Sequence, residues 1–346
     1  MSVHLTILVT AVLVVVPCAL LGSFLVLRQM TMLGDAISHA ALPGIVLAFF
    51  LTGSLGSLSA IAGAAVLGLV TVAAVEALQR SGRVRADASI GIVFTALFAL
   101  GVLLIARYGG NVHLDLEHVL YGEIAFTPLQ VVAVGDTVLG PRSWWTMGAV
   151  TVVVGGFVLL LFKELKLATF DPALAAVIGL SPVLVHYLLT AVLSVTVVGA
   201  FDSVGAILVV AFLAGPPATA YLLTERLGRM MAIAVAVGLL AAVVGYLLAV
   251  LTNASIAGMM ATVVGAIFLL VLLASPSHGL LAGAVRRRRR DHRLRLALVA
   301  HAAAELGEDA DAAALAARLC WPTHEVVKVL TSGGTGPPLR YDERTI

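Results

Sequence analysis

Long apolar runs separated by short polar segments dominate residues 5–274 of the chain. A helix needs about 20 apolar residues to cross the hydrocarbon core of a bilayer. The pattern predicts nine such helices, at roughly Leu5–Leu27, Ala36–Leu51, Leu58–Leu78, Ala88–Ala106, Trp144–Phe162, Pro182–Ala200, Val204–Leu222, Met230–Leu251 and Ser255–Ala274. Gly215, Pro216 and Pro217 stand inside the seventh run, where we expect them to break or kink the helix. The predicted fold is an all-α polytopic membrane protein.

Composition agrees with this prediction. Of the 346 residues, 61% are hydrophobic and 12% are charged, whereas soluble domains carry about 25% charged residues. Met1–Leu5 lacks the basic residues of a cleaved signal, so the first run is expected to be a retained helix. Cys18 lies in an apolar run and Cys320 in the polar tail, so we expect neither a disulfide nor a cysteine-based metal site.

Basic residues divide the loops into two sets. Most of them fall in one set: Arg28, Arg80, Arg83, Arg85, Lys163, Lys166, Arg226, Arg229 and the run Arg286–Arg290. The alternate loops carry only Arg107 and Arg142. Because cytoplasmic loops are enriched in Lys and Arg, the first set and the C-terminal tail are predicted to face the cytoplasm, and the N-terminus to lie outside.

Asp35 and His39 are the most informative polar residues of the apolar region. They are four residues apart at the start of the second run, so on a helix they share one face. A charged side chain at the bilayer centre costs about 2.5–3.5 kcal/mol even on insertion scales. A bound divalent cation would compensate both groups, and mixed oxygen and imidazole donors suit manganese, iron or zinc. From spacing alone, a hydrogen-bonded pair that only holds helices together is an equal alternative.

A short helix is predicted in the cytoplasmic loop after the fifth run. Asp171 followed by Pro172 is typical of a helix start, and Gly179 is typical of a helix end. These signals predict about two turns of helix between two membrane spans. The segment is either a docking element for a partner or a simple surface turn.

The outer loop between Arg107 and Ser143 is long and rich in acids and histidines. It contains His113, Asp115, Glu117, His118, Glu123 and Asp136. It is either an ordinary solvated loop or an acidic vestibule that concentrates cations. Asp202, expected in a tight outside turn, is a further candidate at the entrance, so the metal candidates beyond Asp35 and His39 are His113, Asp115, Glu117, His118, Glu123 and Asp202.

Six segments together resemble a known family, in its order along the chain. They are Leu33–Gly44 (LGDAISHAALPG), Asp87–Gly101 (DASIGIVFTALFALG), Asp115–Pro128 (DLEHVLYGEIAFTP), Phe170–Gly179 (FDPALAAVIG), Val204–Leu222 and Ser275–Leu281 (SPSHGLL). The chain resembles the permease subunits of metal-type ABC importers, the ABC-3 family. The resemblance implies a type II importer-like fold, Asp35 and His39 as intramembrane metal ligands, and a coupling segment that contacts the ATPase through Asp171, Pro172, Ala173, Ala176 and Gly179.

The same resemblance implies several partners. They are two cytoplasmic ATPase subunits, an extracytoplasmic metal-binding protein and a second permease subunit, either identical or paralogous. The transported divalent metal is the cargo and no permanently bound cofactor is expected. The outer loop and the segment after Ser203 resemble the manganese and iron types more than the zinc types, so manganese is favoured over zinc and iron.

The sequence also limits the other functions. No Gly-Lys pair of a P-loop occurs, so ATP hydrolysis requires a separate chain. A gradient-driven secondary metal transporter is the alternative, since Pro43 and Gly215–Pro217 would suit paired broken helices. No HExxH, Ser/His dyad or paired-aspartate motif stands in the apolar runs, so the chain is not expected to be an enzyme.

The chain is predicted to divide into a transmembrane domain, residues 1–284, and a cytoplasmic tail, residues 285–346. The run Arg286–Arg290 is expected to contact anionic membrane lipid. Residues 292–331 predict three helices that resemble a truncated winged-helix module. The third helix offers only Lys328 against Glu325, which argues against nucleic-acid binding. Residues 333–346 are predicted to be disordered.

Overall fold

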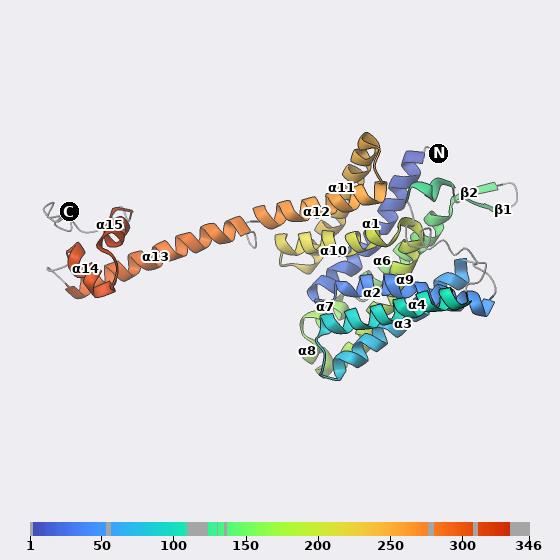
Figure 1. Ribbon diagram of the computed structural model, residues 1–346, viewed down its shortest axis with the longest axis horizontal. Helices are drawn as coiled ribbons and strands as arrows, with labels where there is room; N and C mark the ends of the chain where they lie inside the picture. The colour runs from blue at the N-terminus through green and yellow to red at the C-terminus, as the bar shows by residue number, and fades with distance from the viewer. Residues whose placement is uncertain are drawn as a thin grey trace. The chain divides into compact units, whose positions relative to one another are not determined.

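Figure 1 shows the computed structural model of the chain, which is built almost entirely of helices. The structure describes residues 3–52, 57–108, 124–129, 131–134, 137–275, 280–306 and 311–332. The chain forms two compact units, Met1–Leu272 and Leu273–Ile346. The predicted boundary after residue 284 falls inside a helix, Leu280–Leu306.

The helices of the first unit follow the predicted apolar runs. They are α1 (Val3–Leu27), α2 (Met32–Thr52), α3 (Ser57–Arg80), α4 (Ala86–Tyr108), α6 (Arg142–Leu160), α7 (Phe162–Phe170), α8 (Pro172–Val177), α9 (Pro182–Val204), α10 (Ala206–Leu223), α11 (Leu227–Thr252) and α12 (Ile256–Ala274). Each of the nine predicted spans corresponds to one helix of this set, and α7 and α8 occupy the polar loop between two of them.

Within the described residues, seven helical segments are long and apolar enough to cross a membrane. They lie in α1, α3, α6, α9, α10, α11 and α12, and α4 contains a shorter apolar stretch, Ala88–Leu104. Large aliphatic side chains such as Leu51, Leu160 and Leu251 are 77–88% exposed. Water-soluble monomers rarely expose wide apolar surfaces, so these outer faces are suited to contact with lipid.

Helix α1 lies at the centre of the first unit. It packs against α6, α9, α10 and α11, and side chains such as Val14 and Phe24 are fully buried. Helices α2, α3 and α4 form a second packed group (Figure 1). Helix α9 contacts members of both groups. The arrangement gives α2 close neighbours along most of its length.

Gly215–Pro217 were predicted to break or kink the seventh span, and the structure shows that they do not break it. Helix α10 runs through Pro216 and Pro217 without interruption. Proline removes the hydrogen bond to the carbonyl four residues earlier, so Pro217 deprives the Leu213 carbonyl of its helical donor. That carbonyl lies directly against Gly22 of α1. Backbone carbonyls that lose their helical donor are tolerated in membrane helices where they are surrounded by other parts of the protein.

Pro17 in α1 is accommodated in a related way. It deprives the carbonyl of Leu13 of its helical donor. The hydroxyl of Thr151 in α6 lies 2.7 Å from that carbonyl and 2.7 Å from the carbonyl of Met147 in its own helix, so its one proton is shared between the two acceptors. The freed acceptor is therefore satisfied by a neighbouring helix, as membrane interiors require.

The segment before α6 contains regular structure that the sequence did not predict. The 3-10 helix η1 (Ile124–Leu129) is followed by strands β1 (Val131–Val134) and β2 (Thr137–Pro141). The strands pair antiparallel, with an irregularity between Val132 and Ala133. η1 contacts α1 and α9. This part of the outer loop is folded against the helices.

The second unit contains three helices, α13 (Leu280–Leu306), α14 (Ala312–Leu319) and α15 (Thr323–Ser332). They share a small core around Val299, Leu315 and Val326. Three helices were predicted, but the first was expected to begin at Leu294, whereas α13 begins at Leu280 and includes the arginine run. The predicted disordered end, residues 333–346, lies outside the described residues.

Candidate metal site

Asp35 and His39 lie in the first two turns of α2 and face each other. The imidazole Nε2 of His39 is 3.5 Å from Oδ1 of Asp35. The Asp35 side chain is 36% exposed and that of His39 is 35% exposed. Both groups therefore remain accessible, and the sequence prediction that they share one face is confirmed. Together they offer an oxygen and a nitrogen donor on one side of α2.

Two aromatic side chains of α4 contact the imidazole. The ring of Phe94 stacks on His39 with centroids 5.5 Å apart and an interplanar angle of 27°. The ring of Phe98 meets it edge-on at 5.8 Å and 82°. The sequence analysis placed both phenylalanines in a membrane span but gave them no role. Because they are four residues apart, they share one face of the helix, and this spacing could have indicated a common contact.

The helix that carries the two donors is held by close contacts on two sides. A methyl group added at Gly44 would lie 2.6 Å from the carbonyl oxygen of Gly63 in α3. One added at Gly101 in α4 would lie 2.9 Å from Cδ of Pro43. Small residues permit such close approach of membrane helices. The position of α2 is therefore fixed by α3 and α4 immediately after His39.

Within the described part of the chain, no three His, Cys, Asp or Glu side chains gather in a metal-binding cluster. A transition metal ion bound in a protein generally takes four or more ligands. Asp35 and His39 together offer two side-chain donors from one chain. An ion bound to them would need further ligands, for example water or donors from another chain.

Most of the other predicted metal ligands lie outside the described residues, namely His113, Asp115, Glu117, His118 and Glu123. Asp136 of the same loop also lies outside them. Asp202 was expected in a tight turn, but it lies in the last turn of α9. Its Oδ2 is 3.4 Å from a guanidinium nitrogen of Arg142. Asp202 is therefore engaged in an ion pair at the end of the bundle predicted to face outward.

The predicted short helix between two spans is present as α8. The carboxylate of Asp171 accepts a hydrogen bond from the Leu174 amide at 2.9 Å, which caps the helix start, and Pro172 is its first residue. Gly179 has a φ of +87°, a conformation that favours glycine, two residues after the helix ends. The local prediction is confirmed, although α8 has only six residues.

The surface of α8 and its flanks is exposed and largely apolar. Phe170 is 56% exposed, Val177 83% and Ile178 63%. Asp171, Pro172, Ala173, Ala176 and Gly179, the predicted coupling residues, are all exposed. A contiguous apolar patch of this kind commonly marks a protein–protein contact.

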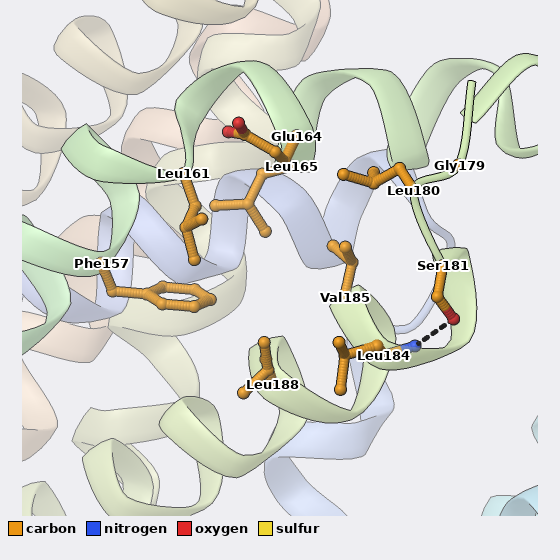
Figure 2. A pocket seen from close by; sticks show the side chains of 10 residues that line it. All are labelled: Phe157, Leu161, Glu164, Leu165, Gly179, Leu180, Ser181, Leu184, Val185 and Leu188. Carbon is orange, nitrogen blue, oxygen red and sulfur yellow. Dashed lines mark hydrogen bonds between the residues drawn. The ribbon is translucent and has the colours of Figure 1, made fainter. Parts of the chain in front are cut away.

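A cavity of about 300 Å³ lies behind this segment (Figure 2). Its apolar walls come from α6, α7 and the start of α9, among them Phe157, Leu165 and Leu188. Gly179, Leu180 and Ser181, which follow α8, form part of its edge. Glu164 stands at the edge of this cavity, and among the described residues one of its buried carboxylate oxygens has no hydrogen-bond partner. The residues that follow α8 therefore lie beside a cavity and are not tightly packed on that side.

Comparisons with known proteins agree with the fold. Residues 2–275 match the family described as the ABC 3 transport family. The chain is 48% identical to the manganese transport system membrane protein MntD of Bacillus subtilis, over 83% of this chain and 97% of that protein. It is 47% identical to the zinc transport system membrane protein TroD of Treponema pallidum, over 78% of this chain and 73% of that protein.

A solved structure has a similar fold. The chain matches PsaBC from Streptococcus pneumoniae in complex with Fab, with a TM-score of 0.66 and 30% identity. The match covers 80% of this chain and 94% of the solved chain.

Proposed function

From the premise that this chain belongs to the ABC 3 transport family and is a membrane permease subunit of a metal-importing ABC transporter, we propose that it carries manganese past Asp35 and His39. Nothing in the comparisons supports the alternative of a gradient-driven secondary transporter. As a multi-pass transport component, the chain has no enzymatic role of its own.

The observation that carries the proposed site is the pair of donors 3.5 Å apart on one exposed face of α2. Carboxylate and imidazole together suit manganese, zinc and iron. Relatives named for manganese and for zinc transport are almost equally similar. We favour manganese because the sequence of the outer loop resembles that of the manganese-type family members. Zinc and iron are the alternative transported ions, since the same two ligands suit them.

Two donors from one chain leave the ion under-coordinated, which supports a second permease subunit. An equivalent Asp and His from a partner would bring the protein donors to four around a shared path. The partner is an identical chain or a paralogue. The ion would be delivered from outside by a metal-binding protein and released on the cytoplasmic side.

The α8 segment supports contact with a cytoplasmic ATPase. Phe170, Val177 and Ile178 offer exposed apolar surface in a loop predicted to be cytoplasmic. A capped, six-residue helix can move as one piece when a partner pushes on it. The residues proposed to meet the ATPase are Asp171, Pro172, Ala173, Ala176 and Gly179. From the distribution of basic residues, we expect the C-terminal unit to lie in the cytoplasm as well.

The test is radioactive manganese uptake by the complete transporter in proteoliposomes loaded with ATP. Asp35→Asn and His39→Ala should each abolish uptake while the permease still assembles with its ATPase. Asp291→Asn, which removes an exposed carboxylate in α13, serves as the matched control and should transport normally. Normal uptake by both site variants would refute the proposed site.

A further inference from the structure

We propose that Phe94 and Phe98 are positioning residues for the metal site, because they hold the imidazole of His39 in the orientation that binds the ion. The inference rests on the proposed function of Asp35 and His39. It assigns to α4 the task of orienting the imidazole. Neither phenylalanine is expected to touch the ion.

The imidazole needs such support because its second side-chain torsion is broad and weakly restrained. Metal-binding histidines are usually oriented by a hydrogen bond from the other ring nitrogen to a carboxylate or carbonyl. In the described part of the chain, the polar partner of the His39 ring is Asp35, which is itself a proposed ligand. The orientation of the ring therefore depends on its aromatic neighbours.

The two phenyl rings constrain the imidazole in complementary ways. Phe94 lies nearly parallel to it, with an interplanar angle of 27°, and restrains tilting of the ring. Phe98 approaches at 82° and restrains rotation about the side-chain axis. Offset-stacked and edge-on contacts at these separations are the favourable aromatic geometries. Together they leave the ring one well-supported orientation, with Nε2 toward Asp35.

Helix α4 is a firm base for this clamp. Phe94 and Phe98 are one turn apart and share a face. Gly101, one further turn along, packs closely on Pro43, one turn after His39. The series Phe94, Phe98 and Gly101 therefore meets His39 and Pro43 along one helix–helix seam. The open side of the imidazole and of Asp35 is left free for the ion.

An imidazole that is already oriented loses little rotational freedom when it binds the ion, and such pre-organisation increases affinity. Loss of the two phenyl rings should therefore weaken manganese binding.

The experiment measures manganese binding by the purified complex of the permease with its ATPase, without the metal-binding protein, so that only the membrane site is observed. Phe94→Leu and Phe98→Leu keep an apolar side chain but remove the ring, whereas Phe94→Tyr and Phe98→Tyr keep the ring. Loss of the groups that orient a metal ligand typically costs about 10–100-fold in metal affinity. Each Leu variant should weaken manganese binding by about tenfold, and each Tyr variant should remain near wild type.

Phe268→Leu in α12 is the matched control, because it removes a half-buried phenylalanine on a helix that does not contribute to the site. Binding is normalised to the assembled complex, so a variant that assembles poorly still reports its affinity for manganese. Leu variants with unchanged affinity would overturn the inference. Equal loss in the Leu and Tyr variants would also overturn it, by showing that packing alone matters. Failure of the proposed function differs, since wild type and Asp35→Asn would then behave alike.

Discussion

The carbonyl oxygen of Leu213 in α10 lies directly against the α-carbon of Gly22 in α1. Pro217 has removed the helical donor of this carbonyl, and glycine lets the two backbones approach closely. A methyl group at residue 22 would overlap the oxygen. The path of α10 through two prolines therefore depends on one glycine of another helix.

Gly22→Ala is expected to destabilise the first unit. Overpacking of a tight contact costs about 1–3 kcal/mol, and here the obstructing atom is backbone. Gly155→Ala in α6 is the control, since a methyl group there meets nothing within 4 Å and helical alanine is favoured by about 0.5–1 kcal/mol. Thermal unfolding in detergent should separate the two variants. Equal melting temperatures would contradict the proposed contact.

Thr151→Val is expected to lower stability because the freed Leu13 carbonyl loses its hydroxyl donor. Interhelical hydrogen bonds in membrane proteins contribute about 0.6 kcal/mol on average, and up to about 1.7. Pro17→Ala restores a backbone donor to that carbonyl. In the Pro17→Ala background, Thr151→Val should therefore cost less, and a double-mutant cycle in detergent measures the difference. Additive effects would argue that Thr151 does not serve the proline site.

Asp171→Ala is expected to weaken coupling to the ATPase. It removes the cap of α8, a loss of about 0.5–2 kcal/mol, and a six-residue helix has little else to hold it. Manganese uptake per ATP hydrolysed should fall several-fold, while metal binding at Asp35 and His39 is unchanged. Asp171→Ser retains a capping oxygen and should behave nearly as wild type. The two substitutions behaving identically would rule out a capping role.

Val326→Asp is expected to unfold the C-terminal unit without stopping transport. Val326 is fully buried in the core shared by α13, α14 and α15, and an unpaired buried charge costs several kcal/mol. Trypsin should then cleave readily near Arg318. Manganese uptake should persist, since the family match ends at residue 275. Val326→Ile is the control, and loss of uptake in the Asp variant alone would assign the tail a part in transport.

Local signals predicted the helices well because each depends on a few adjacent residues. The apolar run Ala88–Ala106 matches α4, Ala86–Tyr108, within two residues at each end. Asp171 and Pro172 begin a helix where the capping pattern required one. Asp35 and His39 lie together because a helix must place residues four apart on one face.

What the sequence did not predict depends on contacts between distant residues. Pro216 and Pro217 argued for a broken helix, and only the nearness of Gly22 shows why α10 continues. Phe94 and Phe98 contact His39 across two helices, which a single apolar run cannot reveal. The first tail helix was predicted from its apolar pattern to begin at Leu294, whereas α13 begins at Leu280. The arginine run between them has no apolar pattern, so the pattern could not indicate that the helix includes it.

The central place of α1 has a consequence for synthesis of the chain. It precedes the other described helices along the chain, so it leaves the ribosome before they do, and its window of apolar residues is 61% buried. Two of its main neighbours, α10 and α11, are not complete until residues 223 and 252. The nascent α1 must therefore remain in lipid without these two partners while the residues up to 252 are translated. A ribosome that stops before residue 252 leaves an incomplete product in which α1 still lacks part of its packing.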